Sequence, residues 1–264
     1  MKKITSKDGT TIAFEQLGEG PALILVDGAL CYRTFGPMEP LSALLTPHFT
    51  VFTYDRRGRG ESADTTPYTV EREIEDIAAL IAEAGGSASV FGISSGAVLA
   101  LEATASGLAI TRLAIYEPPF INDASQRQQS QDDGTKLGEL LAAGQRGAAI
   151  ELFMTMAGTP AEMISQMRGA PMWPALEALA PTLAYDMAIM GHSSGDGSLP
   201  VERLATITIP TLVMSGGASP AGMTEGVQQV ARALLHGQYR PLAEQTHNVA
   251  PQVLAPVLIE FFKS

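Results

Sequence analysis

The pentapeptide at residues 92–96, Gly-Ile-Ser-Ser-Gly, is the part of the sequence best suited to nucleophilic chemistry. A short apolar run precedes it and a small-residue pattern typical of a helix follows it, which predicts a strand, a sharp turn and a helix. A serine at the apex of such a turn is held in strained backbone geometry with its hydroxyl clear of the sheet. Glycines flank Ser94 at two residues on each side, whereas the same frame around Ser95 would place Ile93 at a crowded position. We therefore predict that Ser94 is a nucleophile.

A serine nucleophile needs a base that accepts its proton, and histidine has a suitable pKa. His247 comes just after the last predicted strand, at about 238–243. It is therefore expected at the carboxyl edge of the sheet, where open α/β folds bind their ligands. Two alternatives stay open. His247 could instead cap the final helix, and His192 is a rival base if its segment folds back over the site.

Acyl transfer also needs backbone N–H groups directed at the carbonyl oxygen of the substrate. The residue after the nucleophile and a residue that follows an earlier strand usually provide them. Ser95 and Ala29 occupy these two places. Their side chains can be small because only their amides matter.

Four landmarks in the right order resemble the α/β-hydrolase family: the pentapeptide at 92–96, the loop Asp55–Ser62 (DRRGRGES), the position after Glu117, and the late His247. The similarity extends over nearly the whole chain and is weakest at 120–200. It implies an α/β-hydrolase fold with a mostly parallel sheet, a Ser94 nucleophile, a His247 base and oxyanion amides at Ala29 and Ser95.

One departure from the family pattern is the Asp27-Gly28 pair, which stands where the family commonly has His-Gly. We favour the interpretation that the Asp27 carboxylate caps the turn or binds a nearby backbone amide. If it pointed inward instead, its negative charge beside a developing oxyanion would weaken ester hydrolysis.

The second departure concerns the acid that orients the histidine. Family members usually carry Asp in the loop after the strand that ends here at Met214, but Ser219 stands at that position. Some relatives, such as certain haloalkane dehalogenases, place the acid one strand earlier, where this chain has Glu117. We predict Glu117 as the orienting acid, and the alternative is that Glu117 only pairs with a residue of the cap or of a loop.

Strand and helix patterns alternate on both sides of a long helical stretch. Buried strands are expected at 22–26, 49–54, 88–93, 113–116 and 207–214, with helices at about 35–45, 70–84, 225–235 and 251–262. This rhythm predicts a mostly parallel sheet covered by helices on both faces. We expect an α/β core at 1–119 and 201–264 and an inserted helical cap at 120–200.

The predicted cap holds seven of the eleven methionines, which suits either a flexible apolar lid or the ordinary inner face of its helices. Its polar beginning, residues 122–134, is interpreted as a mobile entry. We expect Asp27, Leu30, Met154 and Trp173 to line a substrate pocket.

Composition excludes several classes of protein. A net charge of −11 argues against a nucleic-acid partner or an anionic membrane surface, since phosphate binding needs clustered Lys and Arg. The single cysteine, Cys31, cannot form an intrachain disulfide, and the four histidines lack the paired spacing of a metal site. We expect a cytoplasmic protein with a small-molecule substrate, no metal or organic cofactor, no membrane partner and possible homodimers.

These observations predict a serine hydrolase that cleaves a small-to-medium, largely apolar ester or lactone through an acyl-enzyme on Ser94. One alternative is a lyase-type enzyme in which Ser94 and His247 transfer protons without acylation. The other is a catalytically silent member of the fold that binds a ligand.

Overall fold

The computed structural model describes residues 1–121 and 123–264, and its centre is one twisted sheet. The order of the eight strands is β1-β2-β4-β3-β5-β6-β7-β8. β1 and β4 each pair antiparallel with β2, and every other pairing is parallel. The strands are β1 (Lys2–Thr5), β2 (Thr11–Leu17), β3 (Ala22–Val26), β4 (Thr50–Tyr54), β5 (Ala88–Ile93), β6 (Ile110–Tyr116), β7 (Thr211–Gly216) and β8 (Gly237–Leu242).

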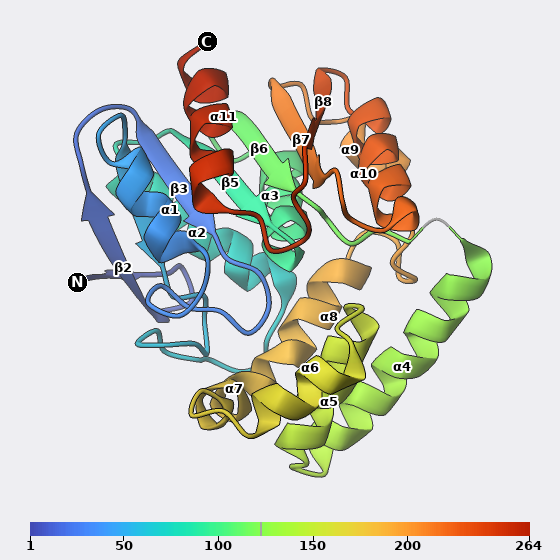
Figure 1. The fold of residues 1–264 in the computed structure, drawn as a ribbon. Helices are drawn as coiled ribbons and strands as arrows, with labels where there is room; N and C mark the ends of the chain where they lie inside the picture. The colour runs from blue at the N-terminus through green and yellow to red at the C-terminus, as the bar shows by residue number, and fades with distance from the viewer. Residues whose placement is uncertain (122) are drawn as a thin grey trace.

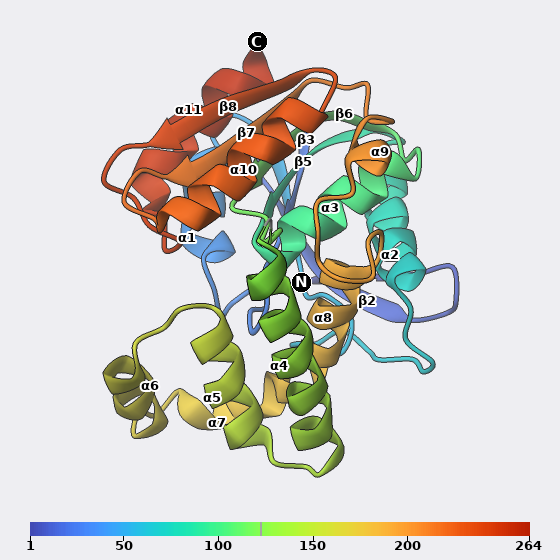
Figure 2. The same ribbon diagram turned by 90° about the vertical axis from the view of Figure 1, so that its right-hand side faces the viewer.

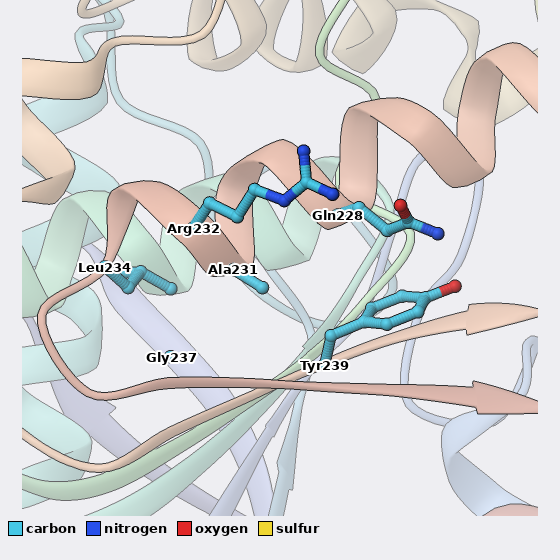
Figure 3. Close-up of a pocket in the computed structure, with 6 residues that line it drawn as sticks. All are labelled: Gln228, Ala231, Arg232, Leu234, Gly237 and Tyr239. Carbon is cyan, nitrogen blue, oxygen red and sulfur yellow. The ribbon is translucent and has the colours of Figure 1, made fainter.

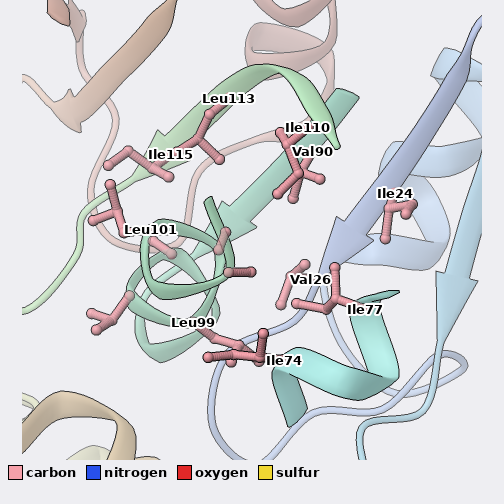
Figure 4. Packing of buried hydrophobic residues seen from close by; sticks show 14 of the residues in the cluster. Ile24, Val26, Ile74, Ile77, Val90, Leu99, Leu101, Ile110, Leu113 and Ile115 are labelled. Atoms are coloured by element: carbon pink, nitrogen blue, oxygen red, sulfur yellow. The ribbon is translucent and has the colours of Figure 1, made fainter. Parts of the chain in front are cut away.

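Helices cover both faces of the sheet (Figure 1). Alternate residues of each central strand point to opposite faces. In β3, Ile24 and Val26 join a cluster that includes residues of α2, α3 and α10, shown in part in Figure 4, whereas Leu23 and Leu25 pack toward α1 and α11. These helices are α1 (Met38–Leu45), α2 (Val70–Glu83), α3 (Ser95–Ala105), α10 (Ala221–Ala233) and α11 (Pro251–Lys263).

A group of helices between β6 and β7 forms a separate body beside the sheet (Figures 1 and 2). Its members are α4 (Ala124–Ala142), α5 (Arg146–Met156), α6 (Ala161–Arg168), α7 (Trp173–Leu179), the 3-10 turn η1 (Ala180–Thr182) and α8 (Leu183–Gly191); the short α9 (Val201–Leu204) leads back to the core. We call α4–α8 the insert. Its interior is an apolar cluster that also includes Leu30 from the loop after β3.

Two sequence-based expectations need correction. The polar segment predicted as a mobile entry is mostly helix, because α4 begins at Ala124 and the Asp123 carboxylate caps it by accepting from the Ser125 and Gln126 amides. Asn122 lies outside the described residues. The strand predicted at 207–214 begins only at Thr211, because Pro210 has no N–H for a ladder bond.

No helix in the described ranges combines the length and the apolar character needed to cross a membrane.

Helix α3 begins very close to β3 because Gly96 has no side chain. A Cβ at Gly96 would lie 2.4 Å from the Asp27 carbonyl oxygen and 2.5 Å from that of Val26. These are backbone atoms, so they cannot rotate away.

We expect Gly96→Ala to destabilise the protein by about 2 kcal/mol or more, since overpacking forces the backbone to move. Urea denaturation measures the change. Gly138→Ala in α4 is the matched control: a Cβ there meets nothing within 4 Å, and Ala is favoured over Gly in a helix by about 1 kcal/mol. Equal effects of the two substitutions would contradict this account of the turn.

Candidate active site

Ser94 occupies the sharp turn between β5 and α3. Its backbone angles, φ 56° and ψ −127°, are strained for a residue with a side chain. The turn is tight because a Cβ at Gly92 would lie 2.5 Å from the Gly96 carbonyl oxygen. The Ser94 amide donates to the Tyr116 carbonyl at 3.0 Å, which ties the turn to the end of β6. The half-buried Ser94 side chain thus sits at the carboxyl edge of the sheet, as predicted.

Glu117 and His247 form a hydrogen-bonded pair at the same edge. The distance from His247 Nδ1 to Glu117 Oε2 is 2.7 Å. Glu117 is fully buried and has a positive φ of 46°, which turns the chain sharply at the end of β6. Its other oxygen, Oε1, accepts from the Gly216 amide at 2.8 Å and from the Ser219 hydroxyl at 2.6 Å.

The loop that carries His247 is fixed from two sides. The Tyr116 hydroxyl donates to the Thr246 carbonyl at 2.5 Å, directly before the histidine. The Ala218 amide donates to the Gln245 carbonyl at 2.8 Å, which joins this loop to the one after β7. Residues from the ends of three strands therefore determine where the imidazole lies.

Hydrogen bonds keep Glu117 ionised. Burial alone raises the pKa of this carboxyl, but the hydrogen bonds from His247, Ser219 and the Gly216 amide outweigh burial and hold the pKa below its usual value. A carboxylate at Nδ1 favours the tautomer with its proton on Nδ1, which leaves Nε2 as the acceptor. The His247 side chain is 41% exposed, whereas that of Glu117 is fully buried.

The hydroxyl of Ser94 makes no hydrogen bond to His247 among residues 1–121 and 123–264. Catalytic hydrogen bonds are often long before substrate binds and tighten in the complex. The roles of Ser94, His247 and Glu117 therefore remain predictions, while the hydrogen bond between His247 and Glu117 is observed. In the rival base, His192, the Nε2 atom lies 3.7 Å from Oε1 of Glu71 in α2.

The loop after β3 passes directly beside the serine. A Cβ at Gly28 would lie 3.1 Å from Ser94 Cβ, and Leu30 has a positive φ of 57°. Within the described part of the chain, the amides of Ala29 and Ser95 donate no hydrogen bond. Both are therefore available as donors, the property expected of oxyanion amides.

Asp27 is buried, and its carboxyl group is not a turn cap. The residue is 2% exposed, and neither oxygen of its carboxyl group accepts a hydrogen bond within the described ranges, so the interpretation favoured from sequence is wrong. Burial raises the pKa of Asp27 to about 7, against the opposing effect of the Arg59 and Arg56 charges. At neutral pH the group therefore carries only part of a negative charge.

Leu30, Met154 and Trp173 lie in one buried apolar cluster, where the insert meets the loop after β3. The structure thus brings together three of the four residues predicted to line a pocket, while Asp27 directly follows β3; that these residues line a pocket stays a prediction. A surface pocket elsewhere, between α10 and β8, is bordered by none of the predicted site residues; Figure 3 shows its lining, which is Gln228, Ala231, Arg232, Leu234, Gly237 and Tyr239.

Sequence reasoning missed a buried charge network behind the site. Asp186 of α8 is fully buried and accepts from Arg56 Nη1 at 2.9 Å, Arg59 Nη2 at 2.8 Å and the Ser95 hydroxyl at 2.7 Å. The Glu73 carboxylate accepts from Arg56 Nε at 2.7 Å and from Arg56 Nη2 at 2.8 Å. The sequence signal for this network was the group of three arginines directly after a buried strand in an acidic chain. No sequence signal pointed to Asp186, since it lies inside the insert.

No group of three or more His, Cys, Asp or Glu side chains within the described ranges could hold a metal ion.

Comparison with known proteins identifies the class. Residues 23–257 match the model of the alpha/beta hydrolase family. An alpha/beta hydrolase from Sphaerobacter thermophilus DSM 20745 is 53% identical, with a TM-score of 0.88 over 99% of this chain and 100% of that one. The chain belongs to the alpha/beta hydrolase family. The predicted family and fold class are confirmed, as is the prediction of a hydrolase.

More distant relatives include named esterases and a lactonase. Pimeloyl-[acyl-carrier protein] methyl ester esterase of Xanthomonas campestris pv. campestris is 28% identical over 236 residues, which covers 84% of this chain and 86% of the esterase. The enol-lactonase of Burkholderia xenovorans LB400 is 19% identical with a TM-score of 0.72 and covers 100% of both chains. At that identity the likeness concerns the fold alone.

We expect Asp27→Asn to stabilise the protein more at pH 8 than at pH 4. The folded-state pKa of Asp27 is raised above the unfolded value, so the wild type loses stability as pH rises from about 4 to about 7. The gain at pH 8 should reach a few kcal/mol, on the order of 1.4 per unit of pKa shift. Urea denaturation at both pH values measures it, with Asp132→Asn on the exposed surface of α4 as control. A pH-independent gain would rule out a raised pKa.

We expect Ser219→Ala to cost about 1 to 3 kcal/mol at pH 7, the usual worth of a hydrogen bond to a charged group. Because the folded-state pKa of Glu117 is lowered, this stabilisation exists above the unfolded pKa of about 4 and is lost as pH falls through the folded value. Denaturation at pH 7 and pH 3 tests it. Thr224→Ala, whose hydroxyl donates to a carbonyl at 3.4 Å, should change stability equally at both pH values.

Proposed function

We propose that this protein is a serine hydrolase that cleaves a small-to-medium, largely apolar ester or lactone through an acyl-enzyme on Ser94. The observation that carries the proposal is the 2.7 Å bond between His247 Nδ1 and a buried Glu117 carboxylate at the same sheet edge as the strained Ser94 turn. A histidine oriented in this way has its Nε2 free to accept the serine proton.

In the proposed mechanism, Ser94 Oγ attacks the acyl carbon and its proton passes to His247 Nε2. The electron pair of the carbonyl moves to oxygen, which the Ala29 and Ser95 amides hold. The tetrahedral intermediate collapses, and His247 returns the proton to the leaving alcohol. Water then attacks the acyl-enzyme by the same route and releases the acid.

The buried Asp27 does not prevent this chemistry near neutral pH. Burial raises its pKa to about 7, so its negative charge is reduced there, and the charges of Arg59 and Arg56 oppose what remains. We propose that the insert acts as a cap over the site. Its apolar cluster around Leu30, Met154 and Trp173 supports an apolar acyl or alcohol group, in line with the esterase and the lactonase among the relatives.

The test is reaction with a serine-directed fluorophosphonate, read by intact mass, together with hydrolysis of short p-nitrophenyl esters. We expect labelling of the wild type, none of Ser94→Ala, and a rate lowered by about 10³- to 10⁴-fold in Glu117→Gln, where the histidine loses its orienting charge. Ser125→Ala, at an exposed serine in the first turn of α4, is the control and should react like the wild type. An unlabelled wild type without esterase activity would favour the lyase-type or ligand-binding alternative.

A further inference from the structure

Arg59 holds the peptide unit that contributes one of the two proposed oxyanion amides. Its Nη1 donates to the Gly28 carbonyl at 2.6 Å. The carbonyl of Gly28 and the amide of Ala29 belong to one trans peptide, so they point in opposite directions. Fixing the carbonyl on the guanidinium therefore fixes the direction of the Ala29 N–H. The positive charge also polarises the peptide, which makes the amide a stronger donor.

The same arginine is connected to the second amide through Asp186. Arg59 Nη2 donates to Asp186 Oδ2 at 2.8 Å, and Asp186 Oδ1 accepts from the Ser95 hydroxyl at 2.7 Å. Ser95 is the residue whose amide is the other proposed donor. The Arg59–Asp186 ion pair thus binds next to both proposed amides, through the Gly28 carbonyl on one side and the Ser95 hydroxyl on the other.

The pair is built as a rigid support. Both side chains are at most 1% exposed, and two basic groups stabilise the carboxylate. Burial would raise the pKa of Asp186, but the charges of Arg59 and Arg56 hold it below the usual value, so the group stays ionised. An arginine suits this place because its planar fork presents two donors in fixed directions, which lysine cannot do.

We propose that Arg59 and Asp186 are positioning residues that orient the Ala29 and Ser95 amides toward the developing oxyanion. The inference rests on the proposed hydrolase function of Ser94 and extends it. Asp186 belongs to α8, so one residue of the insert completes a site whose other parts lie in the core. The pair acts through the backbone and does not itself touch the substrate.

Arg59→Lys tests the proposal, with Arg57→Lys as a matched control. Arg57 is equally buried, and its Nε and Nη2 donate to the two carboxylate oxygens of Asp76 at 2.9 and 2.7 Å. Its other hydrogen bonds go to Asp8 and the Arg72 carbonyl. Both variants lose a buried arginine that donates hydrogen bonds to a carboxylate and to a backbone carbonyl. Only Arg59→Lys removes support from the Gly28 carbonyl.

Two measurements separate orientation of the amides from general destabilisation. The first is the split between kcat and KM on a short p-nitrophenyl ester. The second is the Ki of an alkyl trifluoromethyl ketone. Ser94 adds to the carbonyl carbon of this ketone, its proton passes to His247, and the new oxyanion occupies the amides. Affinity for this adduct follows stabilisation of the transition state rather than of the substrate.

We expect Arg59→Lys to lower kcat by about 10- to 100-fold, to raise the Ki of the ketone by a similar factor and to leave KM nearly unchanged. Arg57→Lys should keep kcat and the Ki of the ketone within about twofold of the wild type, since Arg57 lies outside the site. If Arg59→Lys does not fold, Ser95→Ala replaces it, because it keeps the amide and loses one hydrogen bond to Asp186; kcat should then fall by about three- to tenfold.

If Arg59→Lys has the kcat and Ki of the wild type, the positioning role is overturned. Where Ser95→Ala is needed instead, an unchanged kcat overturns it. Loss of hydrolysis in Ser94→Ala would still support the proposed function in that case. Full hydrolysis by Ser94→Ala would overturn both proposals.

Discussion

The close approach of α3 to β3 is the constraint on which the rest of this molecule depends. Where the helix begins, Gly96 lies so near the carbonyls of Val26 and Asp27 that no side chain fits. Gly92, near the end of β5, has the same restriction against the Gly96 carbonyl. Between them Ser94 adopts a strained conformation, which the packed helix and sheet on either side maintain. The strain is local, and the sheet and helix clusters on both sides of the turn offset its cost.

The same sheet edge explains how the predicted acid, Glu117, can follow β6 although the family pattern places the acid after β7. β6 and β7 are parallel neighbours, so the residues that follow them meet at one edge. The 2.6 Å bond from the Ser219 hydroxyl to Glu117 shows that the two positions converge on one point. A carboxylate that follows either strand is therefore expected to lie near this point. In this chain Glu117 is the predicted acid, and Ser219 is one of the donors that keep its carboxylate ionised.

Much of this arrangement was predictable from sequence because it depends on local rules. Gly-x-Ser-x-Gly spacing, apolar strand runs and a histidine after the last strand each follow from the geometry of a parallel sheet. The state of Asp27 was not predictable, because it depends on whether any polar group in the fold reaches its carboxyl oxygen. The contacts of Asp186 were also beyond reach, since they join it to arginines 127 and 130 positions earlier. The first part of α4 was missed because its residues are polar, although the Asp123 cap marks its start.

Two of the contacts between the insert and the core differ physically. α8 contacts the core through Asp186, a buried ion whose removal from its partners leaves uncompensated charges, a change that costs about 3 to 5 kcal/mol. α5 and α7 contact it through the apolar cluster around Leu30, in which Met154 can adapt its shape at little cost. The ionic contact is directional and adjoins the backbone that carries the proposed oxyanion amides, whereas the apolar contact is not directional. We therefore expect substitutions in the apolar part to change the predicted substrate pocket without moving the groups proposed to perform the reaction.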